Sequence, residues 1–129
     1  MKYLCLICAE KVMEQMPAAD AEAHYQEYAV FTKAIKESGH FIAANRLLPS
    51  ATATTLRVRN GEVLVSDGPF AETKEQFGGY YLIEARDQDE AIRVAAKIPG
   101  AKFGCVELRQ IADDPQTRAL GFDLPQTRA

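Results

Sequence analysis

The sequence lacks any long apolar run. The stretch near the start, Tyr3 to Ala9, has seven residues before Glu10, whereas a membrane-spanning helix needs about 20. The same stretch is poorly built for a secretory signal. No membrane partner is expected, and the protein is predicted to be cytoplasmic. Only 3 cysteines occur, an odd number that indicates reduced thiols and argues against a disulfide framework.

A surplus of basic residues is also missing. The chain has 15 lysines and arginines against 18 acidic residues, which gives a formal charge of −3. Nucleic-acid binding normally rests on a clustered basic surface, so no nucleic acid is expected as a partner. The chain carries no phosphate-cradling glycine loop, nucleophile elbow or metal-binding helix motif. Neither a cofactor nor a metal is therefore predicted.

The cysteines are not predicted to form a metal or redox site. Cys5 and Cys8 have C-x-x-C spacing, but residues three apart in a strand point to opposite faces and cannot grip one metal. Cys105 lies in the last apolar run and is predicted to be a small buried side chain.

The hydrophobic patterns predict one α+β domain. Helix-type spacing from Ala21 to Ile35, stopped by Gly39, indicates a first helix at residues 20–38. Asp87 and Glu90 resemble a capping box that opens a second helix, which ends before Pro99. An Asn-Gly pair at 60–61 is typical of a hairpin turn. Strands are expected at 2–9, 41–48, 52–59, 62–66, 80–85 and 103–109.

This order of elements predicts a ferredoxin-like plait with an extra β-hairpin, its helices on one face of the sheet. The other face would need cover, and a homodimer is the simplest way to supply it. Residues 1–111 are predicted to form the domain and residues 112–129 a polar C-terminal tail. PQTRA occurs twice in this tail, at 115–119 and 125–129. The tail is interpreted as flexible or loosely docked; alternatively, Leu120, Phe122 and Leu124 contact a partner subunit.

Between two apolar runs the chain reads Asp67-Gly68-Pro69-Phe70. Glycine and proline turn the chain sharply here, which holds the Asp67 carboxylate at the rim of a strand. The alternative is that Asp67 only caps its own turn. Thr73 to Gln76 has capping-box spacing and is predicted to open a short helical turn, after which Gly78-Gly79 releases the chain into the next strand.

Residues 67–99, DGPFAETKEQFGGYYLIEARDQDEAIRVAAKIP, closely resemble the signature of the YCII-related family, in its DGPF-domain branch. TATTLR at 52–57 and GCVELR at 104–109 fit the same branch, so the resemblance covers about residues 1–111. It implies a dimeric α+β barrel, in which two ferredoxin-like plaits close their sheets on each other. It also implies a pocket with a suspected His-Asp dyad, in which Asp67 is the aspartate and His24 the better match for the histidine, with His40 as its rival.

A histidine beside a carboxylate in an apolar pocket is a workable general base. The leading hypothesis is therefore a small homodimer whose pocket binds an unknown small molecule and performs acid/base chemistry. The rival interpretations make His24 a hydrogen-bonded packing residue, His40 a partner of a helix C-terminus, and the whole protein a non-enzymatic accessory of an extracytoplasmic-function sigma factor. The residues predicted to contact the ligand are Tyr28, Phe70, Lys74 and Tyr81.

Overall fold

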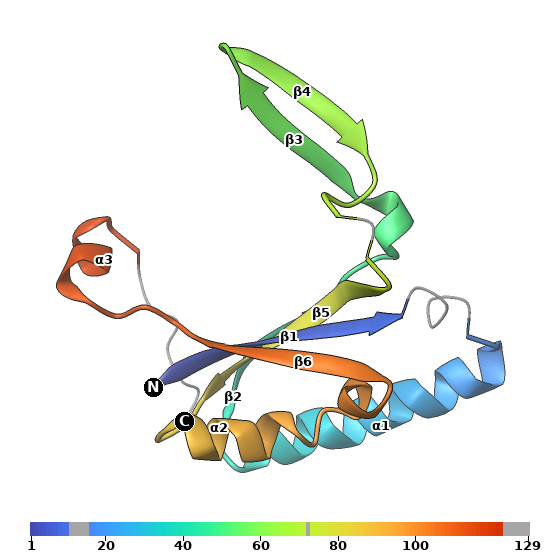
Figure 1. The fold of residues 1–129 in the computed structure, drawn as a ribbon. Helices are drawn as coiled ribbons and strands as arrows, with labels where there is room; N and C mark the ends of the chain where they lie inside the picture. Colours follow the sequence, from blue (N-terminus) through green and yellow to red (C-terminus); the bar gives the residue numbers. More distant parts are fainter. Residues whose placement is uncertain (11–15, 72, 123–129) are drawn as a thin grey trace.

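The computed structural model describes residues 1–10, 16–71 and 73–122. Its centre is a four-stranded antiparallel sheet in the order β2-β5-β1-β6. These strands are Lys2–Glu10 (β1), Phe41–Arg46 (β2), Glu75–Glu84 (β5) and Gly104–Gln110 (β6). Helices α1 (Ala18–Glu37) and α2 (Gln88–Ala95) lie along one side of the sheet (Figure 1). The predicted α+β plait is confirmed.

The core lies between the sheet and the two helices. On β1 and β5, alternate side chains point toward the helices, because successive residues of a strand face opposite ways. Phe31 of α1 meets Tyr81 of β5 edge-on, with ring centroids 5.1 Å apart. The buried apolar cluster comprises Tyr3, Cys5, Phe31, Ile35, Tyr81, Ile83, Ala85, Ala91, Val94, Ala95 and Ile98.

Both predicted helices are present, and their ends follow local chemistry. Gly39 has a φ of +84°, which a glycine adopts easily, and it follows the end of α1. The Asp87 carboxylate accepts a hydrogen bond from the backbone nitrogen of Glu90 at 2.9 Å and caps α2. The predicted cap is therefore confirmed. A short 3₁₀ helix, Pro99–Lys102 (η3), then leads into β6.

The extra hairpin is also confirmed. Strands Thr54–Arg59 (β3) and Glu62–Asp67 (β4) pair through a turn at Asn60 and Gly61, both with positive φ. The first strand starts later than predicted, because residues Ser50–Thr52 form a 3₁₀ helix, η2. The hairpin projects away from the sheet (Figure 1).

Residues 73–76 correct one prediction, because they form no helical turn and β5 begins at Glu75. The buried Gln76 side chain donates to the Thr73 carbonyl at 2.9 Å and to the Ala71 carbonyl at 3.2 Å. These bonds fasten the residues before β5 to its start, while the residues from Glu75 onward pair with β1.

The two glycines at 78–79 lie inside β5 and do not release the chain into it, which corrects a second prediction. They sit where the register of β1 and β5 shifts, between Ile7 and Cys8. A Cβ on Gly79 would lie 2.9 Å from the Asn45 carbonyl oxygen of β2. Glycine therefore permits the close approach of β2 at this bulge.

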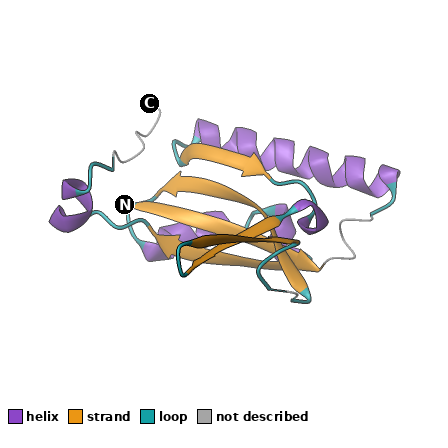
Figure 2. Cartoon of the chain, turned by 90° about the horizontal axis from the view of Figure 1, so that it is seen from above, coloured by secondary structure: helices purple, strands orange, loops and turns teal. Residues whose placement is uncertain are grey.

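The tail begins with a short helix, Pro115–Ala119 (α3), which no sequence pattern predicted. Asp114 caps it by accepting from the Thr117 nitrogen at 2.7 Å. The helix buries none of its side chains and lies away from α1 and α2 (Figures 1 and 2). Leu120 and Phe122 are exposed, whereas Leu124 and the second PQTRA lie outside the described residues.

Among the helices in the described ranges, none is both long enough and apolar enough to span a membrane.

Candidate functional site

A cavity of about 540 Å³ opens between the first half of α1 and the sheet. This volume lies in the range of small-molecule sites, roughly 300–1,000 Å³. Apolar and aromatic side chains dominate its wall, with a few polar groups among them. The described lining residues are Ile7, Ala9, Glu10, Met16, Ala21, His24, Tyr25, Tyr28, Ala44, Asn45, Arg46, Leu47, Leu48, Pro49, Gln76, Gly78, Gly79, Tyr80 and Tyr81.

His24 lines this cavity and has an unpaired polar atom. Its ring meets Tyr28 edge-on at a centroid distance of 5.0 Å and Phe103 at 5.3 Å. The Nδ1 atom is buried and has no hydrogen-bond partner. Buried polar atoms in proteins are nearly always paired, so an unpaired Nδ1 on a residue that lines this cavity is unusual. The His24 ring is thus packed between aromatic side chains, and its Nδ1 makes no hydrogen bond within the described residues.

Tyr28 and Tyr81, two predicted ligand contacts, line the cavity as stacked rings 6.4 Å apart. The Tyr28 hydroxyl accepts a hydrogen bond from the Gly100 nitrogen at 3.1 Å, and burial raises the pKa of Tyr28 to about 12. The Tyr81 hydroxyl bonds Thr32 Oγ1 at 2.6 Å, and burial raises its pKa as well. Both phenols therefore stay protonated at neutral pH and serve as walls and dipoles.

Two charged side chains, Arg46 and Glu10, line the cavity. Arg46, at the end of β2, donates to the Tyr25 hydroxyl and lies over that ring at 5.2 Å from its centroid. It is the only lysine or arginine among the described lining residues. On the other side, the Glu10 carboxylate is 3.2 Å from Lys74 Nζ. Because Lys74 already offsets Glu10, Arg46 is the cation available to an anionic guest.

The predicted residues Asp67 and Phe70 lie outside this lining. Asp67 is exposed at the end of β4, in register with Thr54. The turn after it is fastened by its backbone: Gly68 donates to the Ala53 carbonyl at 2.7 Å and accepts from Thr55 Oγ1 at 2.8 Å. Phe70 is 82% exposed. Within the described chain, the cavity contains His24 and lacks Asp67.

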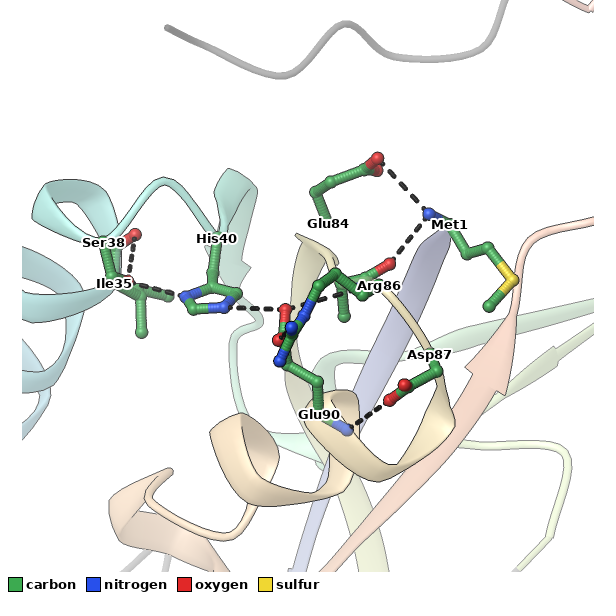
Figure 3. Close-up of polar contacts among 9 residues, drawn as sticks. Met1, Ile35, Ser38, His40, Glu84, Arg86, Asp87 and Glu90 are labelled. Carbon is green, nitrogen blue, oxygen red and sulfur yellow. Dashed lines mark hydrogen bonds and ion pairs between the residues drawn. The ribbon is translucent and has the colours of Figure 1, made fainter.

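His40, the rival histidine, lies at the other end of α1 and has a different carboxylate beside it (Figure 3). Its Nε2 is 3.2 Å from Glu90 Oε1 and its Nδ1 is 2.6 Å from Ser38 Oγ. Glu90 also pairs with Arg86. The hydrogen bond from Arg86 is the largest cause that lowers the pKa of Glu90, and His40 lowers it further. This cluster ties the end of α1 to the start of α2.

Several polar lining residues carry no signal in the sequence. Asn45, Arg46 and Gln76 reach the cavity only through the pairing of β2 with β5 and the bulge in β5. No local pattern marks such a position. In the described ranges, no group of three or more histidine, cysteine or acidic side chains is placed to hold a metal ion.

Comparison with known proteins agrees with this architecture. The model of the YCII-related domain matches residues 1–114. An uncharacterised protein of Rhizobium meliloti (strain 1021) is 36% identical over 105 residues, which cover 80% of this chain and 85% of the relative. The chain therefore belongs to the YCII-related family, as the resemblance of residues 67–99 predicted.

Proposed function

We propose that the cavity binds a small organic molecule with a carboxylate or similar anionic group, and that His24 exchanges a proton with it. The observation that carries this proposal is the buried Nδ1 of His24, which lacks a partner. Leaving a buried polar atom unpaired costs roughly 1–3 kcal/mol. A guest whose polar group meets Nδ1 recovers that cost on binding.

The surroundings of His24 favour a flat, anionic guest. Stacked tyrosine rings offer apolar walls, and aromatic faces bind planar groups well. Arg46 offers a planar fork of donors, which matches the geometry of a carboxylate. In the neutral imidazole, one ring nitrogen accepts and the other donates. With the proton on Nδ1, His24 donates a hydrogen bond to the carboxylate of the guest. Transfer of that proton makes the same nitrogen an acid/base group.

Benzoate is a suitable probe, because it combines a flat ring with a carboxylate, and benzamide is its neutral match. We expect benzoate to bind in NMR titrations and benzamide to bind more weakly. His24→Phe keeps an aromatic ring but removes Nδ1, and Arg46→Gln removes the cation. Each variant is expected to bind benzoate about tenfold more weakly, which corresponds to a loss of roughly 1.4 kcal/mol of binding free energy. Arg93→Gln, on the exposed side of α2, is the control and should bind as the natural protein does.

Equal binding of the two probes would contradict the anionic class. Unchanged benzoate binding by His24→Phe would remove His24 from the site.

We also propose that the protein acts as a homodimer in which a second copy covers the hairpin. Leu56 faces Val65 and Val58 faces Val63 across the two strands, so all four lie on one face of the hairpin. Their exposed fractions range from 60% to 65%. An apolar face of this kind is typical of an interface. Asp67 lies opposite Thr54, on the same face of the hairpin as these four residues. A second copy that covers the apolar face would therefore bury Asp67 as well.

Sedimentation velocity tests this proposal with a matched pair of variants. Val65→Lys places a charge on the apolar face, whereas Leu64→Lys places it on the opposite face of the same strand. The natural protein and Leu64→Lys are expected to sediment as dimers and Val65→Lys as a monomer. A monomeric natural protein would contradict the proposal.

A second candidate function is that of an accessory to an extracytoplasmic-function sigma factor. The exposure of Leu120 and Phe122 beside α3 favours it, since exposed apolar side chains on a terminal segment are available to a partner. A purified sigma factor of this class should bind the full chain and not a chain ending at Ile111. Equal binding by both chains would exclude the tail as the contact.

A further inference from the structure

Cys8 of β1 and Cys105 of β6 stand directly opposite each other. The antiparallel register pairs Ile7 with Val106, Cys8 with Cys105 and Ala9 with Gly104. Residues opposed in this way have Cα atoms about 4.5 or 5.5 Å apart and side chains on the same face. Both distances lie within the span of about 4.4–6.8 Å that a disulfide bridges.

The side chains already meet. The two thiols lie near enough for each to shift the pKa of the other. Cys105 Sγ also donates to Glu75 Oε2 at 3.3 Å. Gly104 permits the close approach of the two strands next to Cys105, because a Cβ there would lie 2.0 Å from the Cys8 carbonyl oxygen.

Solvent reaches this pair and not the third cysteine. Cys105 is exposed and Cys8 is partly exposed, which corrects the prediction that Cys105 is buried. Cys5 has an exposed fraction of 0% and lies in the core beneath the helices. The different facing of Cys5 and Cys8 agrees with the alternation expected along β1. The fold therefore separates one reachable pair from one inert thiol.

We propose that Cys8 and Cys105 form a reversible disulfide within one chain when the protein meets a hydroperoxide. The Cys8 sulfur attacks the peroxide oxygen, the O–O bond breaks, and Cys8 becomes a sulfenic acid as water or an alcohol leaves. The Cys105 sulfur then attacks Cys8; the S–S bond forms, the S–O bond breaks, and water leaves with the Cys105 proton. The two electrons lost by the thiols reduce the peroxide. Glu75 is placed to receive the Cys105 proton on its way out.

Both thiols of the pair favour the protonated form. The hydrogen bond to Glu75 is the largest cause that raises the pKa of Cys105, to about 11. Burial raises the pKa of Cys8, although its contact with Cys105 lowers it. Thiols that keep their protons react slowly, so oxidation requires sustained exposure to peroxide.

Hydrogen peroxide is the probe, applied to the full reduced chain. Thiols counted after denaturation are expected to fall from the 3 free cysteines to one, and dithiothreitol is expected to restore them. Peptide mapping should join the peptide of Cys8 to that of Cys105, with a mass loss of two hydrogen atoms. Cys5→Ala is the matched control and should still form the bond, whereas Cys8→Ser and Cys105→Ser should not.

Three results would overturn the proposal: retention of all thiols, a link that includes Cys5, or links only between chains. If the serine variants fail to fold, peptide mapping of the natural chain decides alone. Because both cysteines belong to one chain, the outcome does not depend on the proposed dimer or on benzoate binding.

Discussion

The Tyr28 hydroxyl oxygen lies 3.1 Å from the backbone nitrogen of Gly100 and accepts its hydrogen. This bond joins α1 to η3, across 72 residues of sequence, and fixes one ring of the cavity wall. Gly100 is buried, and a Cβ on it would lie 2.5 Å from the same hydroxyl. The wall of the cavity therefore depends on a hydroxyl and on the absence of a side chain opposite it.

Tyr28→Phe removes this acceptor and leaves a buried N–H unpaired. We expect the free energy of unfolding, measured with urea, to fall by about 1–3 kcal/mol. Tyr25→Phe is the control, because Tyr25 is exposed and its hydroxyl accepts a hydrogen bond from the Arg46 side chain. Its change should stay within about 0.5 kcal/mol. Equal losses in the two variants would show that the Gly100 bond does not stabilise the fold.

Gly104→Ala and Gly78→Ala test the close approach of β6 to β1. A Cβ at Gly104 would lie 2.0 Å from the Cys8 carbonyl oxygen, whereas one at Gly78 would meet nothing within 4 Å. Overpacking of this kind costs typically about 1–3 kcal/mol, and more where backbone must move. Urea unfolding should show the loss for Gly104→Ala and a much smaller change for Gly78→Ala. The reverse order would contradict the register of β1 and β6.

Asp87→Ala and Asp114→Ala remove the same kind of helix cap from two different settings. Asp87 caps α2, which buries Ala91, Val94 and Ala95, whereas α3 buries nothing. Loss of the Asp87 cap should lower the free energy of unfolding by about 1 kcal/mol. Loss of the Asp114 cap should leave the global transition unchanged and alter only the helical signal of α3. A large global effect of Asp114→Ala would mean that α3 belongs to the cooperative core.

Glu90→Gln tests the acid dependence of the cluster that joins the helices. Arg86 holds the pKa of Glu90 below its ordinary value of 4.5, with a further contribution from His40. The folded state thus favours the charged form, and Glu90 stabilises the protein above pH 4.5. That stabilisation is lost as the pH falls through the lowered pKa.

Unfolding free energies measured from pH 7 downward should differ most between Glu90→Gln and the natural protein near neutrality, and the difference should shrink below about pH 4. Glu62→Gln, at the exposed tip of the hairpin, should show no such trend. A constant difference at every pH would contradict the role given to the charge of Glu90.

Local patterns in the sequence predicted the elements well. Asn60-Gly61 and the Asp87 cap appear where their chemistry requires, because each depends only on neighbouring residues. The helical turn predicted at Thr73 did not form. Thr73 and Gln76 do interact, with Nε2 donating to Oγ1 at 2.9 Å. They do so where the chain bends at Lys74 and enters β5 at Glu75, since pairing with β1 outweighs the local tendency to form a helix.

The candidate site was predicted only in part, because it is assembled by long-range pairing. His24 and Tyr28 were found from the helical stripe and the family resemblance, and Tyr81 from the alternation of side chains along its strand. Arg46 reaches the cavity through the register of β2 with β5. Glu90 meets His40 across 50 residues. Such contacts depend on tertiary packing, which a single sequence does not display.

The nitrogen spectrum of His24 reports whether this side chain contacts a bound guest. Protein labelled with ¹⁵N-histidine would be titrated with benzoate, and the two ring nitrogens followed by NMR. We expect the ¹⁵N chemical shift of His24 Nδ1 to change as benzoate saturates the protein. The signals of His40, which is held between Ser38 and Glu90, should stay in place. Binding of benzoate with an unmoved His24 Nδ1 would contradict the assignment of this cavity as the functional site.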